Sequence, residues 1–413
     1  MTPWLSILGI GEDGLPGMTA AARTLLGRAE LVVGGARHLA MAGSGIGGKV
    51  RPWPSPMAAG IDAVLAERGR PVAVLASGDP FCFGVGTMLT RSLAAGEWRC
   101  IPAASAAALA RSRLGWSEEQ AALRSVCGRP VEALLAALRP GARLLVLSAD
   151  ESSPAAVAAL LARHGYGRSR VHVLERLGGD EERIRCFVAE KGAPDDCARL
   201  NLLAIEAEAE PRARRSFLSA GLPDAWFEHD GQITKREVRA VTLAMLRPSP
   251  GDLLWDLGAG SGSVGIEWML RDPRNRTVAV ERRADRAAAA TRNALAFGVP
   301  ELDVIVADAA AVLPELPPPD AIFLGGGIAD GALVEAARAA LRPEGVLVAN
   351  AVSVDGEAVL LAAQKRHGGT LRRLGVERLD RVGSMRAFRP AMTVTQWVLD
   401  EAVPADPDAG RPW

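Results

Sequence analysis

One segment, from Asp252 to Glu267, limits what this chain can fold into more than any other. An apolar stretch over 253–257 is typical of a buried strand, three glycines over 258–262 form a turn, and a helix begins at about Val264. Glycines let the backbone pass close to a ligand, and the start of a helix presents free N–H groups. Glu281 ends the next apolar run, where an acid can accept hydrogen bonds from both ribose hydroxyls. The segment therefore predicts an α/β fold that binds a nucleoside.

The spacing of the glycines indicates which nucleoside. A dinucleotide-binding turn needs glycine at the sixth position of G-x-G-x-x-G, and Ser263 stands there. The D-x-G-x-G-x-G spacing from Asp256 instead resembles the first motif of the class I S-adenosylmethionine-dependent methyltransferases. For a glycine loop taken alone, an ordinary tight turn is the alternative. The resemblance implies that the methionine part contacts Gly258, Ala259, Gly260, Ser261 and Gly262, that Glu281 binds the ribose, and that Asp308 and Ala309 flank the adenine.

Composition excludes several classes of protein. The 48 basic and 48 acidic side chains cancel, which argues against a nucleic-acid binder. The five cysteines are odd in number without a C-x-x-C pair, and the five histidines lack metal-ligand spacing. We therefore expect neither a disulfide framework nor a bound metal. We also expect a cytoplasmic protein without a membrane partner, because we find no signal peptide and no apolar run of membrane-spanning length.

Strands and helices alternate along the chain, which predicts parallel sheets. A charge-rich stretch interrupted by Pro211 follows Ile205, and we place a domain seam there, although an ordinary helix end is compatible with the same boundary. The expected domains are 1–208 and 231–400, joined by a linker and entry segment over 209–230, with a disordered tail over 401–413. Before the seam we expect strands at 5–8, 31–33, 71–76, 144–147, 171–174 and 202–205, and helices at 19–29, 103–113 and 154–164.

The second half carries five strand–helix units followed by two late strands. That succession matches the sheet of class I methyltransferases, whose last strands form an antiparallel edge. The fold class is therefore α/β throughout, with a Rossmann-like second domain. We expect a helix at 236–246 and strands at 253–257, 277–281, 303–307, 320–324, 345–350, 371–374 and 393–399.

Five loops in the first half are informative when they are taken together, although each alone could be a plain turn or a helix cap. They are Gly9-Ile-Gly-Glu-Asp-Gly14, Ser77-Gly-Asp-Pro80, Ile101-Pro-Ala-Ala-Ser-Ala106, Cys127-Gly-Arg-Pro130 and Leu174-Glu-Arg-Leu-Gly178. In this order they resemble the tetrapyrrole methylases (class III methyltransferases), an α/β fold of two subdomains. The first turn departs from the common Gly-x-Gly-Pro-Gly, as it does in the branch acting on precorrin-6. The resemblance implies a cofactor loop at Gly78, Asp79 and Pro80, a methionine contact at Ala104 and Ser105, and a substrate trough shaped by Gly9 and Gly11.

The segment 227–238 resembles the entry segment of the small decarboxylating precorrin methyltransferases. The resemblance implies that Thr234 approaches the cofactor and that Gln232 and Lys235 position the reacting groups. Lys235 and Arg236 could pair with substrate carboxylates or be plain surface charges. The same residues fit a helix capping box that runs from Thr234 to Glu237. Further along, Gly326 and Gly327 offer either a bare rim for the edge of a substrate ring or a simple turn.

Together the two resemblances imply a cobalamin-pathway enzyme that methylates a tetrapyrrole twice. The implied substrate is precorrin-6B, methylated at carbons 5 and 15 with loss of an acetate carboxylate to give precorrin-8X. The first half would methylate carbon 5, and the second would methylate carbon 15 and release the carboxylate. Each domain would bind one S-adenosylmethionine, and a homo-oligomer is expected because both families form dimers or tetramers. The alternatives are another tetrapyrrole, such as a cobalt-precorrin, and a chain in which one half is only a scaffold.

Overall fold

The structure is a computed structural model that describes residues 3–211, 213–214 and 219–400. The chain divides into two compact units. The first comprises Met1–Val131 with Leu138–Arg214, and the second comprises Glu132–Ala137 with Arg215–Trp413. The predicted tail over 401–413 and part of the predicted seam, at 212 and 215–218, lie outside the described residues.

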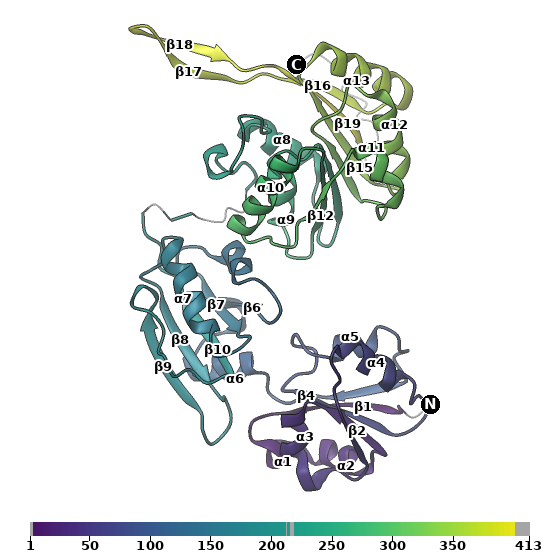
Figure 1. Cartoon of the computed structure of the whole chain (residues 1–413), viewed down its shortest axis with the longest axis vertical. Helices are drawn as coiled ribbons and strands as arrows, with labels where there is room; N and C mark the ends of the chain where they lie inside the picture. Colours follow the sequence, from purple (N-terminus) through teal and green to yellow (C-terminus); the bar gives the residue numbers. More distant parts are fainter. Residues whose placement is uncertain (1–2, 212, 215–218, 401–413) are drawn as a thin grey trace. The chain divides into compact units, whose positions relative to one another are not determined.

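The first unit begins with a sheet of five parallel strands (Figure 1). The strands are β1 (Leu5–Ile10), β2 (Leu31–Gly34), β3 (Lys49–Pro52), β4 (Val72–Ser77) and β5 (Trp98–Ile101), accompanied by helices α2 (Ala20–Arg28), α3 (Ala36–Ala42), α4 (Met57–Leu65) and α5 (Gly86–Thr90). Their order in the sheet is β3-β2-β4-β1-β5. Every residue of β1 is buried, as is usual for a parallel strand covered on both faces. The parallel sheet expected for this part of the chain is confirmed.

A second sheet of five strands completes the first unit. Its strands are β6 (Ala121–Ser125), β7 (Arg143–Leu147), β8 (Arg170–Glu175), β9 (Arg183–Val188) and β10 (Asn201–Glu206), with helices α6 (Ala106–Leu114) and α7 (Ser153–Arg163). In the order β6-β7-β10-β8-β9, the first pair is parallel and the other three are antiparallel, so the prediction of parallel strands is wrong here. The turn 176–182 is too short to join β8 and β9 in any other way, because a parallel pair needs a crossover of a dozen or more residues.

The second unit contains a sheet of seven strands. They are β11 (Leu253–Leu257), β12 (Arg276–Glu281), β13 (Asp303–Val306), β14 (Ala321–Leu324), β15 (Val346–Ala351), β16 (Thr370–Leu374) and β19 (Val394–Asp400). Their order is β13-β12-β11-β14-β15-β19-β16, with β19 antiparallel to both neighbours. The doubly wound sheet with an antiparallel edge is therefore confirmed. The loops that follow β11 and β14 leave the sheet side by side at a point where the strand order reverses, which is where such sheets bind ligands.

Helices cover both faces of this sheet (Figure 1). On one face, α8 (Arg236–Leu246), α9 (Ser263–Met269) and α10 (Ala284–Phe297) contribute Leu243, Ile266 and Phe297 to one apolar cluster. On the other face, α12 (Gly331–Ala340) and α13 (Val354–His367) contribute Leu333 and Leu360 to a second cluster. The predicted helix over 236–246 has the bounds of α8.

A hairpin that the sequence did not predict lies between the last two strands of the sheet. It consists of β17 (Glu377–Val382) and β18 (Met385–Pro390), which form a two-stranded sheet of their own. All twelve of its strand residues are exposed. Strands without a buried face lack the alternation of apolar and polar residues that marks a half-buried strand, so the sequence gives no sign of this hairpin.

A buried ion pair holds the segment 221–234, which includes the first part of the entry segment 227–238, against two helices of the second unit. Arg239 on α8 and Glu267 on α9 are both fully buried, and Nε of the arginine donates to Oε1 of the glutamate at 2.7 Å. Glu267 also accepts the backbone N–H groups of Gly221 at 2.7 Å and Leu222 at 2.8 Å. Arg239 in turn donates to the carbonyls of Leu222 and Thr234. The pair therefore ties both ends of the segment 221–234 to two helices.

An acid is also buried inside the seven-stranded sheet. Asp256 on β11 is 1% exposed, and its Oδ2 accepts the N–H of Gly265 at 3.0 Å. Its Oδ1 has no partner among the described residues. Burial, assisted by the nearby charge of Glu281, raises the pKa of this carboxyl to about 7. Asp256 therefore keeps a proton at pH values at which the unfolded chain has released it.

Replacing Arg239 with methionine would leave the buried carboxylate of Glu267 without its cation. Breaking a buried pair in this way typically costs about 3–5 kcal/mol, so Arg239→Met should lower the free energy of unfolding by that amount. Urea denaturation measures the loss. The matched control is Arg247→Met, which removes a half-exposed pair with Asp400 and should cost less than about 1 kcal/mol. Equal losses in the two variants would contradict the role assigned to the buried pair.

The raised pKa of Asp256 predicts how stability depends on pH. Between about pH 4 and pH 7 the folded state holds a proton that the unfolded chain has lost, so this group makes the free energy of unfolding fall as pH rises, by at most about 1.4 kcal/mol per pH unit. Asp256→Asn should remove that contribution, as measured by urea denaturation at about pH 5 and pH 7.5. Asp285→Asn is the control, because its carboxyl has a pKa of about 2 and does not titrate in this window. Parallel profiles for the wild type and Asp256→Asn would contradict the burial argument.

Candidate functional site

The glycine turn after β11 has a backbone that other residues adopt rarely. Gly258, Gly260 and Gly262 have φ values of 74°, 56° and 72°, all in the left-handed region that favours glycine. The N–H groups of Gly258 and Ala259 donate to the carbonyl of Val280 at 2.9 and 3.1 Å, which holds the turn against β12. Gly262 is the N-cap of α9, so the turn leads directly into the helix start.

The second glycine turn of this unit lies directly against the first. A Cβ atom on Gly258 would lie 2.8 Å from Cα of Gly326, so no side chain fits between the two turns. Gly327, the next residue, is also left-handed, with a φ of 72°. The structure thus brings the predicted rim residues Gly326 and Gly327 beside the predicted cofactor turn.

We call these two neighbouring turns the glycine cradle of the second unit, and Glu281 lies beside them. It ends β12 and is 5% exposed. Its Oε2 accepts the N–H of Gly260 and its Oε1 accepts the N–H of Arg283, both at 2.9 Å. An ionised carboxylate has about four acceptor positions, so each oxygen retains capacity for a ribose hydroxyl.

The loop after β13 lies at the same edge of the sheet. Val306 pairs with Glu281 in the strand register, and Asp308 and Ala309 follow it. The Oδ1 atom of Asp308 accepts the N–H of Ala310 at 3.0 Å, so this side chain caps the short helix α11 (Ala309–Val312). Val306 is 55% exposed and offers an apolar surface beside Glu281, which the sequence did not predict. An exposed valine is an ordinary surface feature until the strand register is known.

The entry segment places Gln232 near the cradle. Its carbonyl lies 3.8 Å from the position of a Cβ on Gly260, and its side chain accepts a hydrogen bond from Arg286 at 3.1 Å. Lys235 is exposed, with Nζ 3.4 Å from the carbonyl of Gly231, and Arg236 is exposed beside it. Both are free to meet a ligand.

The predicted capping box is wrong. The N-cap of α8 is Lys235, and among the described residues its side chain makes no capping hydrogen bond. Thr234 lies one residue too early to cap the helix, and its carbonyl accepts a hydrogen bond from Arg239 instead. An acceptor for the first turn comes instead from Asp224, whose Oδ2 accepts the N–H of Arg236 at 3.4 Å.

In the first unit, three predicted loops meet at main-chain distance. A Cβ on Gly9 would lie 2.0 Å from the carbonyl oxygen of Gly78 and 2.3 Å from the nitrogen of Ala103. Ala103 donates its N–H to that same carbonyl at 3.0 Å. Gly78 has a φ of 54°, and a Cβ there would lie 2.8 Å from the carbonyl oxygen of Ala104. The structure thus brings the end of β1, the Gly78 loop and the 103–105 loop together, and we call this group the glycine cradle of the first unit.

The remaining predicted residues of these loops have structural hydrogen bonds. Oδ1 of Asp79 accepts the N–H of Phe81 at 2.9 Å, and the carbonyl of Pro80 accepts the N–H of Gly86 at 2.9 Å. Ser105 caps α6 through the N–H of Ala108 at 3.1 Å. Gly11 lies beside the side chain of Asp13, whose Oδ1 would be 2.6 Å from a Cβ on the glycine. These bonds fix the loops in place.

His38 supports the Gly78 loop from α3. Its Nε2 lies 3.0 Å from the hydroxyl of Ser77, which also accepts a hydrogen bond from Arg37 at 3.2 Å. Burial, with a contribution from the charge of Arg37, lowers the pKa of His38 to about 4. The imidazole is therefore neutral at neutral pH and acts as a hydrogen-bonding partner of the residue before Gly78.

A cleft of about 670 Å³ opens in the first unit. The sequence did not predict its charged lining, although Arg176 belongs to the motif Leu174-Glu-Arg-Leu-Gly178. Arginines supply a cation from each of three chain segments. The charged residues of the lining are Glu12, Arg37, Arg176, Asp180, Glu181 and Arg199.

Both loop systems fit the same kind of ligand. Each has close-packed glycines where a Cβ would fill the space, and the second adds a buried acid suited to ribose.

Across the described part of the chain, no three histidine, cysteine or acidic side chains are grouped to hold a metal ion. Over the same residues, no helix combines the length and apolar character that a bilayer span requires.

Known families match both halves of the chain. A model of the tetrapyrrole (corrin/porphyrin) methylases matches residues 5–191, and a model of a precorrin methyltransferase domain matches residues 225–401. A precorrin-6Y C(5,15)-methyltransferase (decarboxylating) of Sinorhizobium sp is 50% identical over 397 residues, which are 96% of this chain and 96% of the relative.

Two shorter relatives match part of the chain. A cobalt-precorrin-7 C(5)-methyltransferase of Salmonella typhimurium is 29% identical over 44% of this chain and 88% of its own length. A probable cobalt-precorrin-6B C(15)-methyltransferase (decarboxylating) of Pyrobaculum calidifontis is 35% identical over 34% of this chain and 73% of its own length. Since the full-length match spans both glycine cradles, the chain belongs to the family of decarboxylating precorrin-6Y C(5,15)-methyltransferases.

Proposed function

We propose that this chain transfers two methyl groups from S-adenosylmethionine to carbons 5 and 15 of precorrin-6B, with decarboxylation of an acetate side chain, to give precorrin-8X. The observation that carries the proposal is the presence of two separate glycine cradles, one around Gly78 and one around Gly258. Two cradles support one S-adenosylmethionine in each unit, with no metal required by the chemistry. The full-length relative is named for methylation at two carbons, which is consistent with two sites.

S-adenosylmethionine supplies an electrophilic methyl group on its sulfonium, and the conjugated macrocycle supplies the carbon nucleophile. The chain then has to hold the reacting atoms in line, and good orientation alone can lower a barrier by about 7–11 kcal/mol. In the second unit this task falls to the turn 258–262, to Glu281 at the ribose and to Asp308 and Ala309 at the adenine. In the first unit it falls to Gly78, Asp79 and Pro80 with Ala104 and Ser105.

Loss of the carboxylate needs a place for the electrons of the broken bond. When the bond between the acetate methylene and the carboxylate breaks, carbon dioxide leaves and the conjugated macrocycle takes up the electron pair. The methylene carbon then gains a proton from solvent and becomes a methyl group. The chain contributes orientation and fixed dipoles to this step. Gln232 and Lys235 position the ring, Arg236 binds one of its other carboxylates, and Gly326 and Gly327 give its edge room to approach.

We assign methylation of carbon 15 and decarboxylation to the second unit, and methylation of carbon 5 to the first. Each activity occurs separately in the names of the shorter relatives, one a C(5)-methyltransferase and the other a decarboxylating C(15)-methyltransferase. We further propose that the functional domains are 1–208 and 231–400 with 209–230 between them, and that the protein works in the cytoplasm.

A cobalt-containing precorrin is the second candidate substrate, because both shorter relatives are named for cobalt-precorrins. Absorbance changes on mixing the full chain with metal-free precorrin-6B or with its cobalt counterpart distinguish the two. Turnover of the cobalt compound without turnover of the metal-free one would overturn the preferred substrate.

We also propose that the protein is a homo-oligomer, and that the β17–β18 hairpin takes part in its interface. Leu379 and Phe388 are direct partners across the hairpin and are 55% and 66% exposed, while Met385 at its tip is 70% exposed. A two-stranded hairpin alone is marginally stable in water, and exposed apolar clusters mark interaction surfaces. A second copy of the chain would cover the exposed apolar side chains and would stabilise the hairpin.

Glu281→Ala tests the assignment of the second unit. The change removes charge-assisted hydrogen bonds to the ribose, so it should weaken cofactor binding there by roughly 1–3 kcal/mol. Release of carbon dioxide from precorrin-6B should then slow under limiting cofactor. Glu281→Gln retains an acceptor for the N–H of Gly260 and separates loss of the ribose contact from loosening of the turn.

The matched variant in the other unit is Gly78→Ala, whose Cβ would meet the carbonyl of Ala104. It should block methylation of carbon 5, read by product mass, while carbon dioxide is released at the normal rate. Normal carbon dioxide release by Glu281→Ala under limiting cofactor would mean that Glu281 does not bind the ribose or that the other unit decarboxylates.

The double variant Leu379→Ser with Phe388→Ser tests the hairpin. It makes the cross-strand apolar pair polar and should shift the protein to a smaller species in light scattering after size-exclusion chromatography. Leu361→Ser on α13 is the control, because that leucine is also 50% exposed but lies away from the hairpin in sequence. A strictly monomeric wild-type protein would exclude the oligomer altogether.

A further inference from the structure

The cleft of the first unit contains an arginine in an unusual backbone conformation. Arg176 follows β8 with a φ of 49°, in the left-handed region that non-glycine residues rarely occupy. Its N–H donates to the carbonyl of Leu200 at 3.0 Å, and its carbonyl accepts the N–H of Gly179 at 3.1 Å. Such a conformation persists where surrounding contacts impose it, and it is concentrated at functional sites. A glycine would be relaxed there, so the presence of arginine indicates a use for its side chain.

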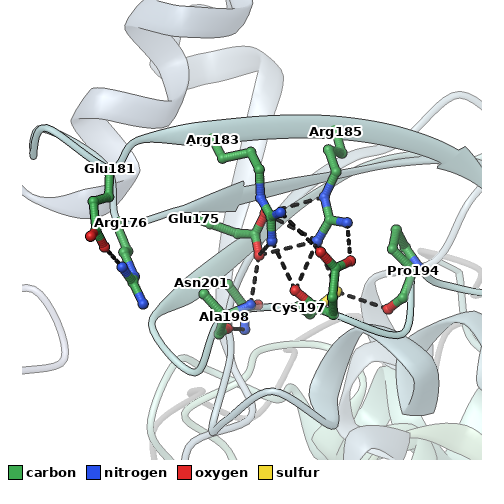
Figure 2. Close-up of polar contacts among 10 residues, drawn as sticks. Glu175, Arg176, Glu181, Arg183, Arg185, Pro194, Cys197, Ala198 and Asn201 are labelled. Carbon is green, nitrogen blue, oxygen red and sulfur yellow. Dashed lines mark hydrogen bonds and ion pairs between the residues drawn. The ribbon is translucent and has the colours of Figure 1, made fainter.

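A buried carboxylate holds the two chain segments that carry the cleft arginines. Glu175 is 1% exposed and accepts hydrogen bonds from Arg183 at 2.7 Å, from Arg185 at 3.2 Å and from the N–H of Ala198 at 2.6 Å (Figure 2). The first two contacts anchor the β8–β9 hairpin, and the third anchors the segment before β10. Arg176 is the next residue after Glu175, and Arg199 is the next after Ala198. The network therefore fixes the backbone from which both arginines reach the cleft.

The charge of Arg176 is available to a ligand. Its ion-pair partner is Glu181, whose side chain is 70% exposed, and Figure 2 shows this pair apart from the buried network. Exposed ion pairs contribute about 0–1 kcal/mol, so an incoming carboxylate can replace Glu181 at little cost. Arg199 also lines the cleft, and its charge acts on the nearby carboxylate of Asp150. Guanidinium groups bind carboxylates with two parallel hydrogen bonds, which favours them over lysine for this purpose.

We propose that Arg176 binds a carboxylate of the macrocycle in the cleft of the first unit, with Arg199 as the second cation and Glu175 as the positioning residue for both. This inference rests on the proposed function, because it takes the substrate of the first unit to be a tetrapyrrole with carboxylate side chains. Binding exchanges the Arg176–Glu181 pair for a pair between Arg176 and the substrate, and Glu181 turns to solvent.

Arg176→Gly in the full chain is the sharpest test, because glycine suits the left-handed backbone and only the guanidinium is lost. For methylation of carbon 5 we expect KM to rise about 10- to 100-fold, the range of one charge-assisted hydrogen bond, with kcat nearly unchanged. The affinity for S-adenosylhomocysteine and the rate of carbon dioxide release should match the wild type. Arg176→Lys should recover part of the lost affinity. Arg168→Gln, which removes an exposed arginine outside the cleft lining, should leave KM unchanged.

Glu181→Gln leaves Arg176 in place and should have the opposite effect, a KM a few-fold lower, because the competing carboxylate is gone. An unchanged KM in Arg176→Gly, or an unchanged or raised KM in Glu181→Gln, would overturn the inference while leaving the proposed function intact. So would an equal loss of cofactor affinity and kcat in Arg176→Gly, which would indicate a purely structural role. Failure of the wild-type chain to methylate any precorrin would instead overturn the proposed function itself.

Discussion

Both candidate sites depend on loops that approach each other too closely for any side chain to fit between them. A Cβ on Gly9 would lie 2.0 Å from the carbonyl oxygen of Gly78, and a Cβ on Gly258 would lie 2.8 Å from Cα of Gly326. Gly9 lies near the end of β1 and Gly78 follows the neighbouring strand β4, while the turns at Gly258 and Gly326 follow the neighbouring strands β11 and β14. Parallel pairing brings the carboxyl ends of such strands together, and glycine lets the main chains meet there. The cradles are thus a direct consequence of strand order and of glycine at a few positions.

Buried charged residues fix the position of the segments that surround the two cradles. The buried pair of Arg239 and Glu267 holds the entry segment of the second unit. In the first unit the buried carboxylate of Glu175, paired with the partly exposed Arg183 and Arg185, holds the cleft wall. Buried ion pairs are poor sources of net stability, but removing one partner is expensive. They therefore suit places where a loop must adopt one position. In both units the anchored segment carries exposed cations, Lys235 in one and Arg176 in the other.

Sequence patterns predicted the parallel strands and the glycine turns well, because both have a local cause. The turn 258–262 and the acid Glu281 could be placed from spacing alone, since a strand, a turn and a helix of ordinary length leave little freedom. The antiparallel part of the second sheet and the exposed β17–β18 hairpin could not, because pairing partners and lone hairpins leave no periodic trace. The Arg239–Glu267 pair did leave a signal, namely one charged residue on a helix face whose other buried residues, at 238, 242, 243 and 246, are uncharged. Its partner, and Val306 beside Glu281, required the three-dimensional register.

The two separate glycine cradles lead us to expect that each unit binds its own cofactor. Isothermal titration of the full chain with S-adenosylhomocysteine tests this most directly, because it counts sites without depending on the scarce tetrapyrrole substrate. We expect two bound molecules per chain, in two independent sites. A stoichiometry of one per chain would contradict it and would leave one of the two glycine cradles as a structural feature without a ligand.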